Sequence, residues 1–437
     1  MKKVFSHFTI LLLCVSLILS GCQKNNTNNS QIERDKTSSN QINNDKTNST
    51  VFSKSKQQTE NKIGINIKTE PHNDFRGKLN VFPSYEGDYN SMENDTFDFR
   101  GYDLSDIDLS THLNELLYSI FDSTTIWPNK MPDKFIPNEI MKNGKNPGLN
   151  IKKLHKSGLD GKGISIGIID GPILTGHSEF TNCLTYYDTV IPTVSCSKDF
   201  KYKERFHGNA VASIATGKNI GVAPGAKLYY VSADSRDSED KITYQYYAEA
   251  INKLLDINKQ LPENKKIRAI SISWSFSDEN IPFYKEAQEA IERAVSENVI
   301  IFCTDMYKYM DFTFCSGADR NPLGNPDNLA AYSLGTWEKN NYEGHKDGIL
   351  FPMDSRSFAS PTGVNDYAWV RIGGWSWVMP YITGLYAICL QINPNIIVEE
   401  FSNALSATAD TIIVDNLGSK VPIHIVNPIK LSEYVKK

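Results

Sequence analysis

Short apolar runs alternate with stretches of helical periodicity from about residue 146 onward, and this alternation restricts the fold more than any other feature. Four β-branched or apolar runs have the length of buried strands: 164–169, 228–231, 267–272 and 299–303. Between them, apolar residues recur at helical spacing over 247–255 and 283–295. Alternation of this kind predicts βαβ units, and therefore an α/β fold in which helices flank a mostly parallel sheet.

The N-terminus has the organisation of a secretory signal. Two lysines precede an apolar run over residues 8–19, which is too short to span a bilayer as a helix. The run ends in Leu-Ser-Gly-Cys at 19–22, which resembles the lipobox of bacterial lipoproteins, in which the cysteine is acylated. We expect a signal peptide at 1–21, lipidation at Cys22, and an extracytoplasmic protein anchored to the bacterial cell membrane. An ordinary secretory signal with an incidental cysteine is the alternative.

Residues 22–60 form a polar segment that is rich in Asn, Ser, Thr, Lys and Gln. Such a composition buries too little apolar surface to offset its ordering entropy, so it predicts a disordered tether after the lipidated cysteine. The net charge of the whole chain is −5 over 437 residues. A net negative charge does not indicate the basic surface that nucleic-acid binding requires, and we therefore expect no nucleic-acid partner.

Residues 61–145 show neither regular helical nor regular strand periodicity. Phe99, Leu104 and Leu109 recur at five-residue intervals, which resembles one turn of a pentapeptide repeat. One turn cannot form a solenoid, because such repeats need stacked neighbours. We therefore expect an N-terminal extension at 61–145 that packs on a main domain at 146–437. A propeptide-like role for the extension is the alternative, although the segment has no recognisable processing signal.

The cysteines leave two interpretations open. Seven are present, and an odd number remains once the signal-peptide cysteine and the lipidated cysteine are set aside: Cys183, Cys196, Cys303, Cys315 and Cys389. The first two and the next two are close enough in sequence to close small disulfide loops. Buried free thiols explain the same pattern equally well. No Cys-x-x-Cys motif or Cys/His cluster indicates zinc.

Three polar residues stand where chemistry is expected in such a sheet. Asp170 follows the strand candidate 164–169, His207 precedes a small apolar helical stretch, and Ser376 precedes an apolar run at 378–390 that predicts a buried helix. Each has a structural alternative when taken alone. Asp170 fits a turn or cap, His207 fits a surface loop, and Ser376 fits a helix N-cap.

Together, the sequences around these residues resemble the subtilisin-like serine peptidases, or subtilases. That family has the chain order Asp, His, Ser, and the present spacings of 37 and 169 residues are compatible with it. Residues 207–212, His-Gly-Asn-Ala-Val-Ala, are similar to the family's His-Gly-Thr-His-Val-Ala, and Gly-Val-Ala-Pro follows at 221–224. Residues 374–380, Gly-Trp-Ser-Trp-Val-Met-Pro, are similar to Gly-Thr-Ser-Met-Ala-x-Pro. The resemblance covers about residues 148–430.

The resemblance implies a subtilisin-like three-layer fold and a serine endopeptidase that acts on a protein or peptide substrate. Asp170, His207 and Ser376 would form the catalytic triad and proceed through an acyl-enzyme. Residues 273–275, Ser273, Trp274 and Ser275, stand where the family has a substrate-pairing strand edge. We predict no cofactor and no metal site. Calcium, which many subtilases bind, stays open, because the acidic residues lack EF-hand spacing.

The sequence also departs from the family pattern. Ala210 replaces a second, non-catalytic histidine, and Trp375 and Trp377 replace the Thr and Met that flank the nucleophile. The family's oxyanion Asn is missing after the strand candidate 299–303, where Asp305 is the nearest equivalent. Loss of one oxyanion donor typically costs ~100- to 1000-fold in turnover, a magnitude established on subtilisin itself. The alternative function is therefore a weak or inactive subtilase-fold lipoprotein that binds peptides or a partner protein.

Overall fold

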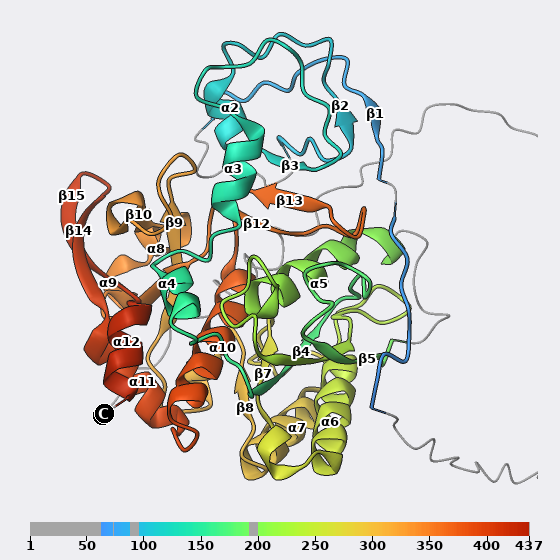
Figure 1. The fold of residues 1–437 in the computed structure, drawn as a ribbon, viewed down its shortest axis with the longest axis vertical. Coiled ribbons are helices and arrows are strands. Elements are labelled where there is room, and N and C mark those ends of the chain that lie inside the picture. The colour runs from blue at the N-terminus through green and yellow to red at the C-terminus, as the bar shows by residue number, and fades with distance from the viewer. Residues whose placement is uncertain (1–62, 73, 88–95, 192–199, 437) are drawn as a thin grey trace, which may run out of the picture. The chain divides into compact units, whose positions relative to one another are not determined.

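The computed structural model describes residues 63–72, 74–87, 96–191 and 200–436, with side chains from 206 onward in the last range (Figure 1). The expected signal peptide at 1–21, the lipidation site Cys22 and the tether at 22–60 lie outside the described residues. Within the described ranges, no helix is both long and apolar enough to cross a bilayer.

A parallel five-stranded sheet forms the centre of the main domain. Its strands, in spatial order, are β5 (Leu184–Thr189), β6 (Lys227–Ser232), β4 (Ser165–Asp170), β7 (Ile267–Ile272) and β8 (Ile300–Phe302). Every neighbouring pair is parallel. All four predicted strands are confirmed in this sheet, and β5 is an edge strand that the sequence did not indicate.

Helices cover both faces of this sheet (Figure 1). One face carries α6 (Gln245–Gln260) and α7 (Tyr284–Ser296), and the other carries α5 (Phe200–Thr216) and α10 (Trp375–Ile392). The predicted helices are thus confirmed as α6, α7 and α10, and the α/β prediction with a parallel sheet is confirmed as well. All residues of α10 from Trp377 to Leu390 are buried, because this helix lies between the central sheet and the C-terminal part of the chain.

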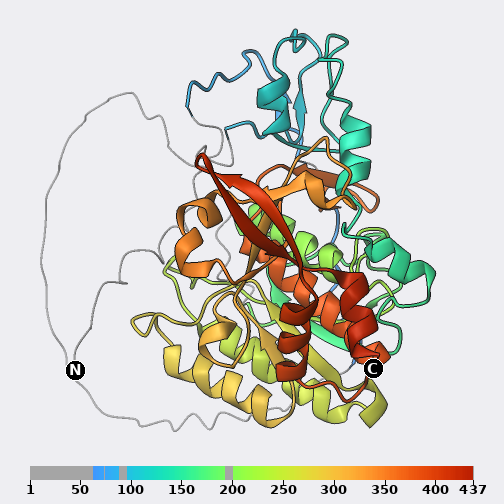
Figure 2. The same ribbon diagram turned by 90° about the vertical axis from the view of Figure 1, so that its left-hand side faces the viewer.

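A second, mixed sheet follows the central one. Its strands, in spatial order, are β10 (Tyr332–Leu334), β9 (Cys315–Arg320), β11 (Ile349–Pro352), β15 (Ser419–Ile425) and β14 (Asp410–Asn416). Figure 2 shows β14 and β15 as a long hairpin. Its two connecting residues, Leu417 and Gly418, both have positive φ, which is the backbone geometry that a tight right-twisted hairpin requires.

Shorter elements complete the main domain. The remaining helices are α4 (Ile151–Lys156), α8 (Thr336–Asn340), α9 (Tyr342–His345), α11 (Val398–Thr408) and α12 (Pro428–Val435). Among the described residues, single turns of 3-10 helix lie at Glu263–Lys265, Met306–Lys308 and Leu329–Ala331. Most of the apolar residues of these parts belong to one continuous core.

The N-terminal part has a small core of its own. It contains β1 (Gly77–Lys78), β2 (Tyr102–Asp103), α2 (Leu113–Leu117), β3 (Ile120–Asp122) and α3 (Pro137–Gly144). Phe99, Leu104 and Leu109, the residues at five-residue intervals, are all buried in this core together with Trp369. Trp369 comes from β13 (Tyr367–Val370), which pairs with β3 on one side and with β12 (Arg356–Ala359) on the other.

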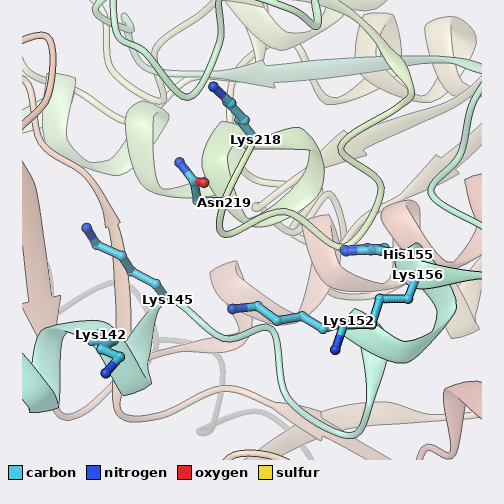
Figure 3. Close-up of a pocket in the computed structure, with 7 residues that line it drawn as sticks. All are labelled: Lys142, Lys145, Lys152, His155, Lys156, Lys218 and Asn219. Carbon is cyan, nitrogen blue, oxygen red and sulfur yellow. The ribbon is translucent and has the colours of Figure 1, made fainter.

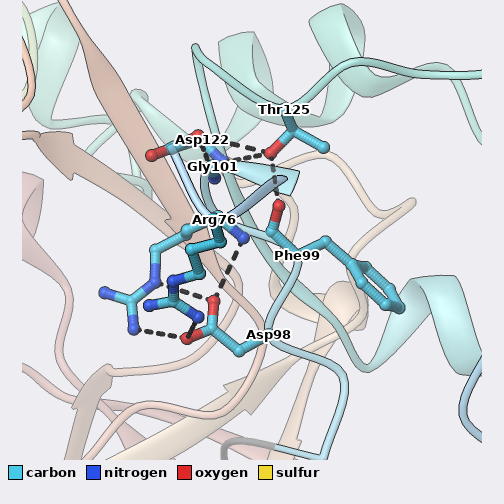
Figure 4. Close-up of polar contacts among 7 residues, drawn as sticks. Arg76, Asp98, Phe99, Gly101, Asp122 and Thr125 are labelled. Atoms are coloured by element: carbon cyan, nitrogen blue, oxygen red, sulfur yellow. Dashed lines mark hydrogen bonds and ion pairs between the residues drawn. The ribbon is translucent and has the colours of Figure 1, made fainter. Parts of the chain in front are cut away.

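An ion-pair cluster secures the chain next to this core (Figure 4). Arg100 donates two hydrogen bonds to Asp98, of 2.8 and 2.7 Å, and Arg76 donates a third, of 3.0 Å. Burial by itself raises the pKa of Asp98, but the two guanidinium groups outweigh this effect and hold that pKa at about 2. Nearby, Thr125 Oγ1 donates to the carbonyl oxygen of Phe99 at 2.9 Å, so the five-residue turn is tied to the following segment.

The described cysteines are buried free thiols. Cys183, Cys303, Cys315 and Cys389 form no disulfide. The loop-closing pair Cys303–Cys315 is therefore wrong, and the free-thiol interpretation holds for these positions. The other proposed partner, Cys196, lies outside the described residues. Burial raises the pKa of the Cys183 thiol to about 11, which keeps it protonated at neutral pH.

Candidate active site

The first two residues of the expected triad meet at the carboxyl end of the central sheet. Asp170 is the last residue of β4 and is 6% exposed. His207 lies in α5, which begins at Phe200, earlier than the sequence indicated. The Nδ1 atom of His207 is 2.7 Å from Asp170 Oδ1, and the backbone N–H of Gly171 donates to the same oxygen at 2.8 Å. Asp170 therefore occupies neither a cap nor a simple turn, because its carboxylate orients an imidazole.

This contact determines the ionisation of His207. Burial opposes the charged imidazolium, but the carboxylate of Asp170 outweighs burial, so the pKa of His207 lies above its usual value. The close approach of α5 to β4 depends on Gly208, because a Cβ there would collide with the carbonyl oxygen of Gly171. Glycine immediately after the histidine is thus a packing requirement at this crossing.

The imidazole ring of His207 packs against the ring of Trp377. The two rings are 5.1 Å apart between centroids, and Phe358 contacts the same tryptophan at 5.0 Å. Nε2 of His207 is buried and has no hydrogen-bond partner among the described residues. The hydrogen bond from Ser376 Oγ to Nε2 is therefore not formed in this conformation, although Ser376 directly precedes the tryptophan that covers His207.

Ser376 is the second residue of α10, and Gly374 is the N-cap. The N-cap alternative for Ser376 is therefore wrong, because Ser376 is a residue of the helix and Gly374 occupies the N-cap position. Its backbone N–H has no acceptor among the residues that the structure describes. Free N–H groups in the first turn of a helix carry partial positive charge and point away from the helix, so this group is suited to bind a developing oxyanion.

Pro380 explains an unusual contact of the nucleophile candidate. Pro380 lies inside α10 and has no N–H, so the carbonyl of Ser376, four residues earlier, loses its regular helical donor. The hydroxyl of Ser273 donates to that carbonyl at 2.9 Å instead. Ser273, which the sequence marked as a substrate residue, thus connects the end of β7 to the start of α10.

The other residues expected at the substrate edge are engaged inside the protein. The carbonyl of Trp274 accepts the N–H of Thr304 at 3.0 Å, and its ring stacks on Tyr247 at 6.0 Å. Ser275 Oγ donates to Asp305 Oδ2 at 2.8 Å. The segment is therefore held in place from the β8 side, and its side chains contribute to local structure.

Asp305, the nearest equivalent of the missing oxyanion Asn, is 3% exposed. In addition to Ser275, the backbone N–H of Phe276 donates to its carboxylate at 3.0 Å, and the Tyr309 hydroxyl donates at 3.3 Å. These donors provide the buried carboxylate of Asp305 with hydrogen bonds and hold it in position. Asn321, which follows β9, has a side-chain amide, and the oxygen of that amide accepts the N–H of Leu323 at 3.0 Å.

Two acidic residues that the sequence analysis missed support the segment before Ser376. The N–H of Gly373 donates to Asp354 Oδ1 at 2.6 Å, and the indole N–H of Trp375 donates to Glu338 Oε1 at 3.0 Å. Burial raises the pKa of both carboxyl groups. Neither residue belongs to a motif, and their proximity to Ser376 arises only when α8, the end of β11 and the start of α10 pack together.

A metal site is not formed by the part of the chain that is described, because no group of three or more His, Cys, Asp or Glu side chains converges there.

One family model matches the central part of the chain. Residues 161–317 match the model of the Peptidase S8 family, described as the subtilase family. The match includes Asp170, His207 and Asp305 and ends before Ser376. This part of the chain is therefore similar to the subtilase family, as the resemblance predicted. Subtilases are serine peptidases, so the match supports a peptidase-type function.

Solved structures show a distant likeness. The prenylagaramide maturation protease PagA is 19% identical over 65% of this chain and 98% of that chain, with a TM-score of 0.41. The PatG macrocyclase in complex with peptide is 17% identical over 66% and 96%, with a TM-score of 0.42. The patellamide maturation protease PatA is 20% identical over 63% and 97%, with a TM-score of 0.41. Likeness at this level says nothing about the substrate of this chain.

Proposed function

We propose that the protein is a serine endopeptidase of the subtilase type. One observation carries the proposal: a region similar to the subtilase family in which His207 Nδ1 and Asp170 Oδ1 are 2.7 Å apart at the carboxyl end of the central sheet. A carboxylate at Nδ1 selects the imidazole tautomer whose Nε2 accepts a proton, and it stabilises the imidazolium that results. Ser376, at the start of α10 and next to the residue that contacts the imidazole, supplies the nucleophile.

The proposed reaction has two halves. Ser376 Oγ attacks the peptide carbonyl carbon while its proton passes to His207 Nε2, and the backbone N–H of Ser376 donates to the oxyanion. The carbon–nitrogen bond then breaks, the leaving amine takes the proton from Nε2, and an acyl-enzyme remains. Water attacks the acyl group with His207 again as base, which releases the carboxylic acid and restores the Ser376 hydroxyl. Asp170 keeps its charge throughout.

The proposal includes a place of action outside the cytoplasm. Cys22 would carry the lipid anchor, and the polar tether at 22–60 would let the domain reach protein or peptide substrates at the membrane surface. Metabolic labelling with a radioactive fatty acid tests this part, because Cys22→Ala should abolish the label.

A weak or inactive protein that binds peptides is the second candidate, and two observations favour it. His207 Nε2 is buried without a hydrogen-bond partner among the described residues, and Asp305, the nearest sequence equivalent of the family's oxyanion Asn, is a carboxylate that accepts from Ser275, Phe276 and Tyr309. The two candidates differ in one respect. The endopeptidase needs Ser376 to be reactive, whereas a binding protein does not.

A fluorophosphonate probe that modifies activated serines separates them. We expect covalent labelling of the wild-type chain, loss of labelling in Ser376→Ala, and full labelling in Ser296→Ala, which removes an exposed hydroxyl on α7. Mass spectrometry should place the adduct on the peptide that contains Ser376. Folded wild-type protein that stays unlabelled after prolonged exposure would refute the endopeptidase and leave the binding protein.

A further inference from the structure

A strongly basic hollow lies between α3, α4 and the end of α5, outside the candidate active site (Figure 3). Its volume is about 520 Å³, and its lining is entirely Lys, His and Asn: Lys142, Lys145, Lys152, His155, Lys156, Lys218 and Asn219. Thr216, where α5 ends, is nine residues beyond His207 and so about 14 Å further along the helix axis. The hollow is therefore a separate feature.

The positive charges of the hollow are only partly balanced. Lys142 pairs with Glu139 at 3.3 Å. Lys152, Lys156 and Lys218 form no ion pair with any residue that the structure describes. The nearest buried carboxylate, Glu179, accepts from the backbone N–H of Asn219, its side-chain amide and the Tyr367 hydroxyl at 2.7–2.8 Å.

Even when both glutamates are counted, five lysines leave a surplus of three positive charges at one place on a chain of net charge −5. The hollow is thus positively charged, although the chain as a whole carries a net negative charge. Such a surplus raises the free energy of the folded state through repulsion. A bound anion would remove this repulsion.

One ammonium group is already partly withdrawn from water. Lys145 is half-buried and lies 3.0 Å from the centre of the Tyr367 ring. Burial lowers the pKa of Lys145, and Glu179 counteracts this only in part. In Figure 3, the Lys152 and His155 side chains extend from α4 toward the side of the hollow formed by α3, and Lys218 lies above them. Cationic groups from three elements thus surround one space.

The chemistry of the lining indicates the class of ligand. No Phe, Tyr, Trp or aliphatic side chain lines the hollow, and the polar groups of its lining side chains are ammonium, imidazole and amide groups. Lysine is a compact point charge that binds phosphate readily, and a phosphate group carries more negative charge than a carboxylate against this surplus of positive charge. The volume is in the range of about 300–1,000 Å³ that is usual for small-ligand sites.

We propose that this hollow binds a ligand with several phosphate groups. Phosphates placed between α3, α4 and the end of α5 would accept hydrogen bonds from Lys145, Lys152, Lys156 and Lys218 together. The phosphate can belong to a soluble or polymeric phosphate compound or to the headgroup of an anionic lipid. The proposal does not depend on peptidase activity.

Calorimetry of the full chain in mild non-ionic detergent tests the proposal, with inorganic tripolyphosphate as the probe in 150 mM salt. The test variant is Lys152→Gln/Lys156→Gln/Lys218→Gln. Each ammonium close to a phosphate contributes roughly fivefold to affinity, so we expect the triple variant to bind roughly 100-fold more weakly. All three side chains are exposed, and the variant should keep the wild-type circular dichroism spectrum and unfolding midpoint.

The matched control is Lys259→Gln/Lys285→Gln/Lys420→Gln, which changes the net charge equally at exposed lysines outside the hollow. We expect its affinity to stay within twofold of wild type. Equal weakening in both triple variants would overturn the proposal, because a nonspecific charge effect would then explain the binding. Absence of tripolyphosphate binding to the wild-type chain would overturn it as well.

Further arms distinguish the source and the class of the ligand. Monomeric dihexanoyl phosphatidylglycerol that binds as tightly as tripolyphosphate supports a lipid headgroup, and binding at least tenfold weaker supports a soluble or polymeric phosphate. A glutamate hexapeptide that matches tripolyphosphate would refute the phosphate class in favour of an acidic peptide. Tripolyphosphate should also protect Lys152, Lys156 and Lys218 from acetylation, as mapped by mass spectrometry, while Lys259 stays reactive.

Discussion

The hydrogen bond between Ser273 and the carbonyl of Ser376 provides the sharpest test of how the start of α10 is held. Pro380 lacks the N–H that would normally bond this carbonyl, and Ser273 Oγ fills the position at 2.9 Å. Leaving a part-buried acceptor without a partner costs about 1–3 kcal/mol. We therefore expect Ser273→Ala to lower the free energy of unfolding by about 1.5 kcal/mol. With a urea m-value of roughly 3 kcal/mol/M, the midpoint should fall by about 0.5 M.

A double-mutant cycle with Pro380→Ala isolates the cause. Alanine at position 380 restores an N–H four residues after Ser376, so the carbonyl regains a helical donor and no longer needs Ser273. In that background Ser273→Ala should cost less than about 0.5 kcal/mol, which gives a coupling energy of about 1 kcal/mol. Any packing defect from the proline substitution itself cancels in the cycle.

Ser271→Ala is the matched control for this cycle. The Ser271 hydroxyl is buried in β7 and has no hydrogen-bond partner among the described residues, so its removal should cost little. Urea unfolding followed by tryptophan fluorescence measures all variants. If Ser273→Ala costs the same with proline and with alanine at position 380, the inference that Pro380 created the need for Ser273 is wrong.

Three further predictions concern the imidazole and the N-terminal core. Fluorophosphonate labelling should become faster as the pH rises through the raised pKa of His207, because the neutral imidazole is the base. Asp170→Asn should shift the midpoint of this pH profile downward and lower the labelling rate about 10,000-fold. An unchanged midpoint would contradict the role of Asp170. Trp377→Met should increase the rate of labelling up to about tenfold, because the contact between the Trp377 and His207 rings is worth roughly 0.5–1.5 kcal/mol. Slower labelling in a folded variant would show that the tryptophan assists the site. Because the pKa of Asp98 is lowered in the fold, its ionised carboxylate stabilises the fold above pH 4, and this stabilisation is lost as the pH falls toward 2. Asp98→Asn should therefore lower the free energy of unfolding by about 2 kcal/mol at pH 7 and very little at pH 2, as measured by urea titration at both pH values. Equal losses at both pH values would refute the ion pair with Arg100 as the cause.

The local pattern of apolar residues was sufficient to predict most strands of the central sheet. The runs at 164–169 and 267–272 became β4 and β7 because β-branched apolar residues bury well on both faces of a parallel sheet. The edge strand β5, which reads Leu-Thr-Tyr-Tyr-Asp-Thr, and the hairpin of β14 and β15 were not indicated, because half-exposed strands carry mixed side chains. The burial of Phe99 and its five-residue companions needed Trp369, which is about 270 residues away in the chain.

The sequence by itself placed Asp170 at the end of a strand, His207 just before a helical stretch and Ser376 at the start of a buried helix, and the family resemblance grouped the three as a triad. Periodicity and short motifs carry this information because each depends on neighbours within a few residues. Only the tertiary structure decided what surrounds them: Trp377 over His207, Ser273 on the Ser376 carbonyl, and the basic hollow of α3, α4 and α5. These contacts join residues separated by tens to hundreds of positions, and side-chain packing, which no local pattern encodes, selects them.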